Sequence, residues 1–244
     1  MKGNDVDGSN VSRPAPVGFP RVVLFDLDGT LLDSAPDMLA TANQLRQAHG
    51  EAAMSLEQIR PHVSKGSRAM LAAAFPALAV AERDALVQPF LDAYQGLSGQ
   101  HARLFDGVEP MLAALEAAGT AWGIVTNKPE YLAREILPML GWQQRCQVLI
   151  GGDSLAERKP HPLPLQVAAE RLGVAPAECV YVGDDERDIV AARAAGMPSI
   201  AALWGYRQAD EQPAQWQADM MCEQASELLD PARWPSTRSE RGDG

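Results

Sequence analysis

Short, continuous apolar runs recur along the chain and constrain its fold more than any other sequence feature. Such runs are typical of strands that are buried on both faces of a sheet. They are Val22–Phe25, Trp122–Val125, Gln147–Ile150, Val180–Val182 and Ser199–Leu203. From about Phe105 onward the runs alternate with stretches of helical periodicity. This alternation predicts a parallel sheet with helices on both faces.

Glycine punctuates the predicted helices between these runs. The helices are Val108–Ala118, Pro129–Leu140, Leu163–Leu172 and Glu186–Ala195, and a glycine directly follows each one. Glycine is favoured there because the residue after a helix often adopts a left-handed conformation. With right-handed crossovers, the expected fold class is α/β, with a doubly wound, Rossmann-like parallel sheet as its core.

The stretch from 37 to 102 has a different character. It is rich in Ala, Leu, Gln and Met, shows helical periodicity and contains no convincing strand. We predict helices there at Asp37–His49, Leu56–Pro76 and Glu82–Tyr94. The predicted organisation is therefore an α/β core at 21–36 and 103–232 with a helical domain inserted at 37–102. Residues 1–20 and 233–244 are predicted to be disordered tails.

Charge and composition exclude several classes of partner. The chain has 32 acidic and 21 basic residues, a net charge of -11, which argues against nucleic-acid binding and gives no reason to expect an anionic membrane as partner. No apolar segment is long enough to span a membrane, and the first twenty residues lack the apolar region of a secretory signal. The three cysteines are scattered, so we expect a reducing, cytoplasmic location. The oligomeric state is left open.

Polar clusters are associated with four of the predicted strands. They are Asp26–Thr30, Thr126–Lys128, Lys159-Pro160 and Gly183–Asp188. Ligands of an open parallel sheet bind beyond the carboxyl ends of its strands. We therefore expect the four clusters to meet at one edge of the sheet, although they lie far apart in the sequence.

The residue types in these clusters indicate phosphoryl chemistry. The cluster would bring together four carboxylates, those of Asp26, Asp28, Asp184 and Asp188. Such crowding is unfavourable without a cation, and carboxylate oxygens with no His or Cys nearby suit Mg²⁺. Lys159, Thr126 and Asn127 supply donors for an anion beside the metal. One carboxylate can then attack phosphorus, and a second can protonate the leaving oxygen and later activate water.

The segment Asp26-Leu27-Asp28-Gly29-Thr30 resembles the first motif of the haloacid dehalogenase superfamily, Asp-x-Asp-Gly-Thr. The other three clusters match the remaining motifs of that superfamily in order, so the resemblance extends from Val22 to about Leu229. It implies that Asp26 is the nucleophile and Asp28 the general acid and base. Dehalogenases of the superfamily lack the second aspartate, so Asp28 points to phosphoryl transfer.

The resemblance also implies the remaining site residues. Thr126 and Lys159 would hold the phosphoryl group. The Mg²⁺ ligands would be the carboxylates of Asp26 and Asp184 and the backbone carbonyl of Asp28. Asp188 would reach the metal through water. Asp185 is left with two interpretations, an acid close to the metal or a helix N-cap.

The helical insert resembles the cap domain that closes over the site in this superfamily and selects the substrate. Lys65 and Arg68 lie where a loop of the cap could face the substrate, and a basic pair there would suit a substrate with its own carboxylate. A solvated helix face is the alternative for both residues.

The chain resembles phosphoglycolate phosphatases, and more closely the N-acetylmuramic acid 6-phosphate phosphatases of peptidoglycan recycling. The segments that carry this resemblance are Ser64–Met70, Val125–Pro129, Gly183–Ile189 and Trp204–Tyr206. It implies hydrolysis of a small phosphate ester, N-acetylmuramic acid 6-phosphate or, alternatively, phosphoglycolate. A sugar phosphomutase on the same scaffold and a receiver-type phospho-accepting module are further alternatives. The position of Asp26 after the first strand argues against a receiver.

Overall fold

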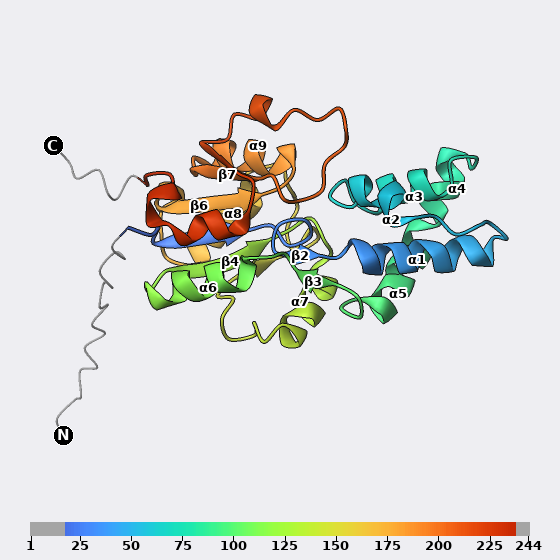
Figure 1. Cartoon of the computed structure of the whole chain (residues 1–244), viewed down its shortest axis with the longest axis horizontal. Coiled ribbons are helices and arrows are strands. Elements are labelled where there is room, and N and C mark those ends of the chain that lie inside the picture. Colours follow the sequence, from blue (N-terminus) through green and yellow to red (C-terminus); the bar gives the residue numbers. More distant parts are fainter. Residues whose placement is uncertain (1–17, 238–244) are drawn as a thin grey trace, which may run out of the picture.

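The core is a six-stranded sheet with the order β5-β4-β1-β6-β7-β8 (Figure 1). The computed structural model describes residues 18–237, so most of the predicted N-terminal tail and residues 238–244 lie outside the described residues. Every neighbouring pair of strands is parallel. The strands are β1 (Val22–Phe25), β4 (Ala121–Val125), β5 (Leu149–Ile150), β6 (Cys179–Gly183), β7 (Ser199–Ala202) and β8 (Met220–Cys222). The predicted α/β class is confirmed, and β8 is a strand that we did not predict.

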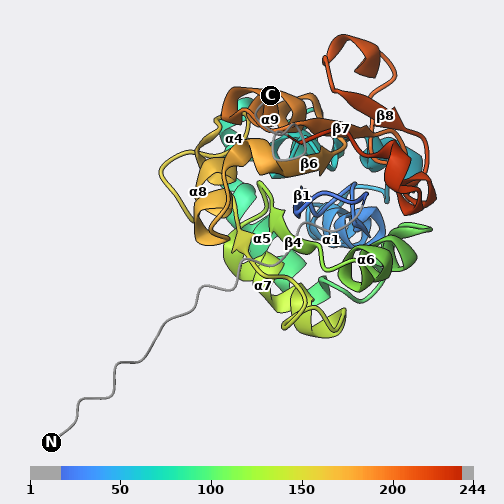
Figure 2. The same cartoon turned by 90° about the vertical axis from the view of Figure 1, so that its left-hand side faces the viewer.

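Helices cover both faces of the sheet, as Figure 2 shows. They are α6 (Val108–Ala117), α7 (Glu130–Met139), α8 (Leu163–Arg171) and α9 (Glu186–Ala195). Val23 and Phe25 of β1 pack in one hydrophobic cluster with α6 and α7, whereas Val22 and Leu24 pack in another with α8 and α9. Because side chains alternate across a strand, β1 is apolar on both faces, and this explains its continuous apolar run.

Strand β1 occupies the middle of the sheet, between β4 and β6. The chain first builds outward through β4 and β5, then returns to the other side of β1 and builds outward through β6, β7 and β8. The carboxyl ends of β1 and β6 therefore flank the point where the strand order reverses. This is the place where ligands bind in doubly wound folds.

The helical insert lies beyond one edge of the sheet and has its own hydrophobic cluster (Figure 1). Its elements are α1 (Ala35–Ala48), α2 (Leu56–Ile59), a 3-10 turn at Arg60–His62, α3 (Ser67–Ala74), α4 (Val80–Ala85) and α5 (Val87–Leu97). A short antiparallel pair joins it to the core, because β2 (Leu32–Asp33) pairs with β3 (Arg103–Leu104). The outgoing and returning connections therefore run side by side.

Two of the predicted helices were wrong in extent. The expected helix Leu56–Pro76 is interrupted between α2 and α3, where Pro61 lacks an N–H and Gly66 adopts a φ of 89°. The expected helix Glu82–Tyr94 is divided at Leu86 into α4 and α5. Pro89 accounts for the second break, because a proline inside a helix cannot bond to the carbonyl four residues earlier.

Parts of both predicted tails belong to the packed structure. Trp234 is buried, and its ring lies 6.3 Å from that of Phe19 in an edge-on arrangement. Thr237 is also buried. Burial of a large aromatic side chain against the core stabilises the folded protein. The described ends of the chain therefore pack where we expected disorder. No helix within residues 18–237 is long and apolar enough to cross a membrane.

Candidate active site

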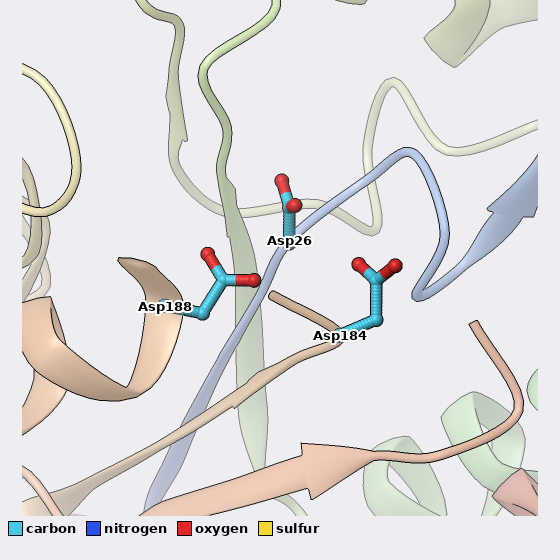
Figure 3. Close-up of side chains that lie close together, drawn as sticks. All are labelled: Asp26, Asp184 and Asp188. Carbon is cyan, nitrogen blue, oxygen red and sulfur yellow. The ribbon is translucent and has the colours of Figure 1, made fainter. Parts of the chain in front are cut away.

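Three buried carboxylates meet at the carboxyl edge of the sheet (Figure 3). Asp26 directly follows β1, Asp184 directly follows β6, and Asp188 lies in the first turn of α9. Each offers a carboxylate oxygen, and these oxygens lie within 4.8 Å of one another. The sequence clusters at 26–30 and 183–188 are thus brought together as predicted.

The electrostatics of this cluster favour the binding of a cation. Burial raises the pKa of Asp184 well above its usual range, and repulsion from Asp26 and Asp188 raises it further. Burial also raises the pKa of Asp188 to about 6, although Lys159 opposes that shift. Three buried carboxylates can be ionised together when a cation lies among them. Their oxygen-only donor set fits a hard divalent cation of the Mg²⁺ type.

Asp184 is held by contacts from several elements. Its carboxylate accepts hydrogen bonds from Thr30 Oγ1 at 3.2 Å, Ser64 Oγ at 2.7 Å and the backbone N–H of Tyr206 at 2.9 Å. Gly29 and Gly205 lie against it so closely that a Cβ at either position would collide with the Asp184 side chain. Both glycines therefore make room for this carboxylate.

Lys159 brings a buried ammonium to the cluster. Its Nζ lies 3.0 Å from Asp26 Oδ1 and 2.7 Å from Asp188 Oδ1, and it donates to Tyr181 Oη at 2.8 Å. Asn127 Nδ2 donates to the backbone carbonyl of Lys159 at 2.9 Å. Asn127, which we expected among the phosphate-binding residues, thus fastens the loop that carries the lysine.

Asp28 lies next to a second buried ammonium, which the sequence analysis did not single out. Lys128 Nζ is 3.1 Å from both carboxylate oxygens of Asp28, and it donates to Tyr94 Oη of α5 at 2.7 Å. Thr126 Oγ1 accepts from the backbone N–H of Lys128 at 3.3 Å, so the Thr126–Lys128 turn also reaches the site. Lys128 directly follows Thr126 and Asn127, and this position was the available signal. Nothing in the sequence indicated Tyr94.

Asp185 has the N-cap role that was one of its two predicted interpretations. Its Oδ1 accepts from the backbone N–H of Arg187 at 3.0 Å, and Asp188 Oδ2 accepts from the Asp185 N–H at 3.1 Å. The other carboxylate oxygen of Asp185 lies 2.7 Å from Lys65 Nζ. Lys65 also pairs with Glu211, and the Arg187 guanidinium donates to the backbone carbonyl of Ser64. The 64–65 loop of the insert is thereby joined to the core.

A cavity of about 290 Å³ lies between the insert and the sheet edge, with Asp26 and Asp28 in its wall. Lys65 and Arg68, which we expected in a loop that could face the substrate, also line it. Both are already paired with acids: Lys65 with Asp185, and Arg68 with Asp84, whose Oδ1 lies 2.9 Å from Arg68 Nε. The apolar and aromatic side chains of the wall are those of Met38, Val63, Met70, Val87, Phe90, Leu91, Tyr94 and Leu132.

Comparison with known proteins gives consistent matches. The model of the family described as haloacid dehalogenase-like hydrolase matches residues 23–202. A Xanthomonas campestris protein named phosphoglycolate phosphatase is 69% identical, over 89% of this chain and 98% of its own. A Pseudomonas aeruginosa protein named N-acetylmuramic acid 6-phosphate phosphatase is 43% identical, over 86% of this chain and 93% of its own. The crystal structure of a predicted phosphoglycolate phosphatase from Haemophilus somnus has a TM-score of 0.76 and 28% identity, and covers 87% of this chain and 97% of its own.

We expect Asp184→Asn to stabilise the metal-free protein. A carboxyl whose pKa is raised by folding binds more protons in the folded than in the unfolded state, so rising pH lowers stability. Thermal unfolding in EDTA between about pH 5 and 8 should therefore show a falling Tm for the parent protein and a flatter curve for the variant. Near pH 8 the Tm of the variant should exceed that of the parent protein, by about 2–4 °C per kcal/mol of relieved repulsion. The exposed Asp106→Asn is the control; an Asp184→Asn curve parallel to the parent's would contradict the expectation.

Proposed function

The chain belongs to the haloacid dehalogenase-like hydrolase family and is a phosphoric monoester hydrolase, and we propose that it acts through a phosphorylated Asp26. One observation carries this proposal. The Asp26 carboxylate lies in the wall of the cavity, 3.0 Å from the buried Lys159 ammonium, and belongs to the acidic cluster that can hold a cation. The family assignment removes the receiver-type alternative.

We propose Mg²⁺ as the cofactor of this site. The carboxylates of Asp26 and Asp184 and the backbone carbonyl of Asp28 would hold it, and Asp188 would reach it through water. When bound, the ion supplies the positive charge that lets the crowded carboxylates and a phosphate group share one site.

The side chains of the chain itself account for the proton and bond changes. Asp26 attacks phosphorus as the bond to the leaving oxygen breaks, and Asp28, which enters this step in its protonated form, gives that oxygen its proton. Lys159 and Thr126 hold the phosphoryl oxygens. Asp28, now ionised, takes a proton from a water molecule that attacks the aspartyl phosphate, which releases inorganic phosphate and restores Asp26.

We further propose that the helical insert acts as a cap domain over the core at 21–36 and 103–232. Its α3 and α5 contribute Arg68 and Tyr94 to the cavity wall, and the 64–65 loop contacts Asp184 and Asp185. A substrate in the cavity would therefore lie between the insert and the sheet. Burial there excludes bulk water from the reacting groups.

We propose N-acetylmuramic acid 6-phosphate as the substrate. The cavity of about 290 Å³ approaches the range of about 300–1,000 Å³ that drug-sized ligands occupy. The apolar side chains in its wall suit the methyl groups of the acetyl and lactyl substituents, which phosphoglycolate lacks. The Pseudomonas relative with that name supports this choice, whereas the name of the Xanthomonas relative favours phosphoglycolate as the second candidate.

The carboxylate of either substrate would need a cationic partner. Lys65, Arg68 and Arg187 line the cavity but already have acidic partners. Arg158 also lines the cavity. It is the one cation of the cavity wall that has no ion pair with any residue between 18 and 237. We therefore propose Arg158 in place of Lys65 and Arg68 as the residue that receives the carboxylate.

Asp26→Asn should abolish turnover, because an amide cannot form the acyl phosphate. We expect kcat to fall by more than about 10⁴-fold, the scale seen when an enzymatic nucleophile is removed. Phosphate release measures the rate, and circular dichroism checks the fold. Asp210→Asn, at an exposed position, should keep the parent rate. Near-parent rates for Asp26→Asn would refute the nucleophile assignment.

Removal of divalent cations should stop hydrolysis, because the acidic cluster would then lack its compensating charge. We expect the rate in excess EDTA to fall to background and to return when Mg²⁺ is added beyond the chelator. An undiminished rate in excess chelator would remove the metal from the proposal.

The substrate proposal predicts that kcat/KM is at least about tenfold higher for N-acetylmuramic acid 6-phosphate than for phosphoglycolate, since even one methylene can contribute that factor. N-acetylglucosamine 6-phosphate is the matched control because it lacks only the lactyl group. Release of inorganic phosphate, and not an isomeric sugar phosphate, separates a phosphatase from a phosphomutase. A preference for phosphoglycolate would favour the second candidate.

A further inference from the structure

Lys128 is a buried cation that the proposed reaction does not use. Its side chain is only 3% exposed, and its Nζ lies 3.1 Å from each carboxylate oxygen of Asp28. The same ammonium donates to Tyr94 Oη at 2.7 Å and lies 4.2 Å from the centre of the Tyr94 ring. Asp28 follows β1, Lys128 follows β4, and Tyr94 belongs to α5. Three elements that are remote in sequence therefore meet at this single ammonium.

The contacts of Lys128 restrict the orientation of Asp28. A lysine ammonium has three N–H donors, and the structure gives it three acceptors: the two Asp28 oxygens and the Tyr94 hydroxyl. A charged group with all its donors engaged holds its carboxylate partner in one orientation.

We propose that Lys128 is the positioning residue for the Asp28 carboxyl group during proton transfer, and that Tyr94 holds Lys128 in place when α5 lies over the site. This inference rests on the proposed role of Asp28 as general acid and base. Lys159 contacts a different pair of carboxylates, those of Asp26 and Asp188, so the two lysines serve separate parts of the site.

The dependence on the leaving group separates positioning of Asp28 from a purely structural role. Phenolate is a poor leaving group and benefits from a proton, whereas 4-nitrophenolate departs readily without one. Phenyl phosphate and 4-nitrophenyl phosphate present similar rings to the same cavity. Their kcat/KM values report the transfer of the phosphoryl group to Asp26, before water takes part. A loss confined to phenyl phosphate therefore identifies a defect in general-acid catalysis.

The experiment compares Lys128→Met and Tyr94→Phe with Asp28→Asn in the full chain with Mg²⁺. For Lys128→Met we expect kcat/KM to fall about 10–100-fold for phenyl phosphate but less than about threefold for 4-nitrophenyl phosphate. The loss for phenyl phosphate is then a part of the roughly 10²–10⁴-fold acceleration that a general acid contributes. The ratio of kcat/KM for phenyl phosphate to kcat/KM for 4-nitrophenyl phosphate should also fall in Tyr94→Phe, but by a smaller factor. Lys65→Met is the matched control. That lysine pairs with Asp185 and Glu211, so its loss should change kcat/KM by the same factor for both substrates.

The outcomes separate the inference from the function on which it rests. Equal losses for both substrates in Lys128→Met, or no loss for either, would overturn the positioning role. If that variant does not fold, the ratio for Tyr94→Phe decides, because this change keeps the ring and the ion pair. An unchanged ratio in Asp28→Asn would overturn the role of Asp28 itself and the inference with it. Failure of the parent protein to release phosphate from either ester would refute the proposed function.

Discussion

The repulsion among the buried carboxylates of Asp26, Asp184 and Asp188 is the constraint on which the site depends. Lys159 contacts two of the three, and hydrogen bonds from Thr30, Ser64 and Tyr206 satisfy Asp184. A cation bound between the oxygens would relieve the repulsion that these contacts do not balance. Since Asp26 and Asp184 end the adjacent strands β1 and β6, the register of these two strands sets the spacing of the carboxylates. The rigid centre of the sheet thus performs the positioning that the chemistry requires.

Two lysines in the cavity wall, Lys128 and Lys65, each have partners from different elements. Lys128 of the core meets Asp28 and is supported by Tyr94 of the insert, whereas Lys65 of the insert meets Asp185 and Glu211 of the core. Buried pairs of this kind contribute little net stability, because desolvation offsets the attraction between the charges. Their effect is to favour one relative placement of the insert and the sheet. The same contacts therefore couple the position of the insert to the reacting groups.

The extent to which the site could be predicted followed the nature of each signal. Asp26 and Thr126 directly follow an apolar run, and Asp184 comes one glycine after another, so their common edge could be inferred from local patterns and the rules of parallel sheets. The partner of Lys128 lies 100 residues away, and no periodicity connects them. The acidic partners of Lys65 are equally remote, so the sequence presented it as a free cation. Pro61, Gly66 and Pro89 are residues that often interrupt helices, but the helical periodicity on both sides of them led us to predict continuous helices.

The pairing of β2 with β3 has a consequence for the history of such proteins. The helical insert leaves and re-enters the core through two neighbouring connections, Leu32 opposite Leu104 and Asp33 opposite Arg103. A segment with adjacent ends can be exchanged without altering the path of the strands around it. Under the roles that we propose for the insert and the aspartates, new ligand preferences can arise by replacing or reshaping the insert alone, while the sheet keeps the same reaction. In this architecture chemistry and selectivity can evolve separately.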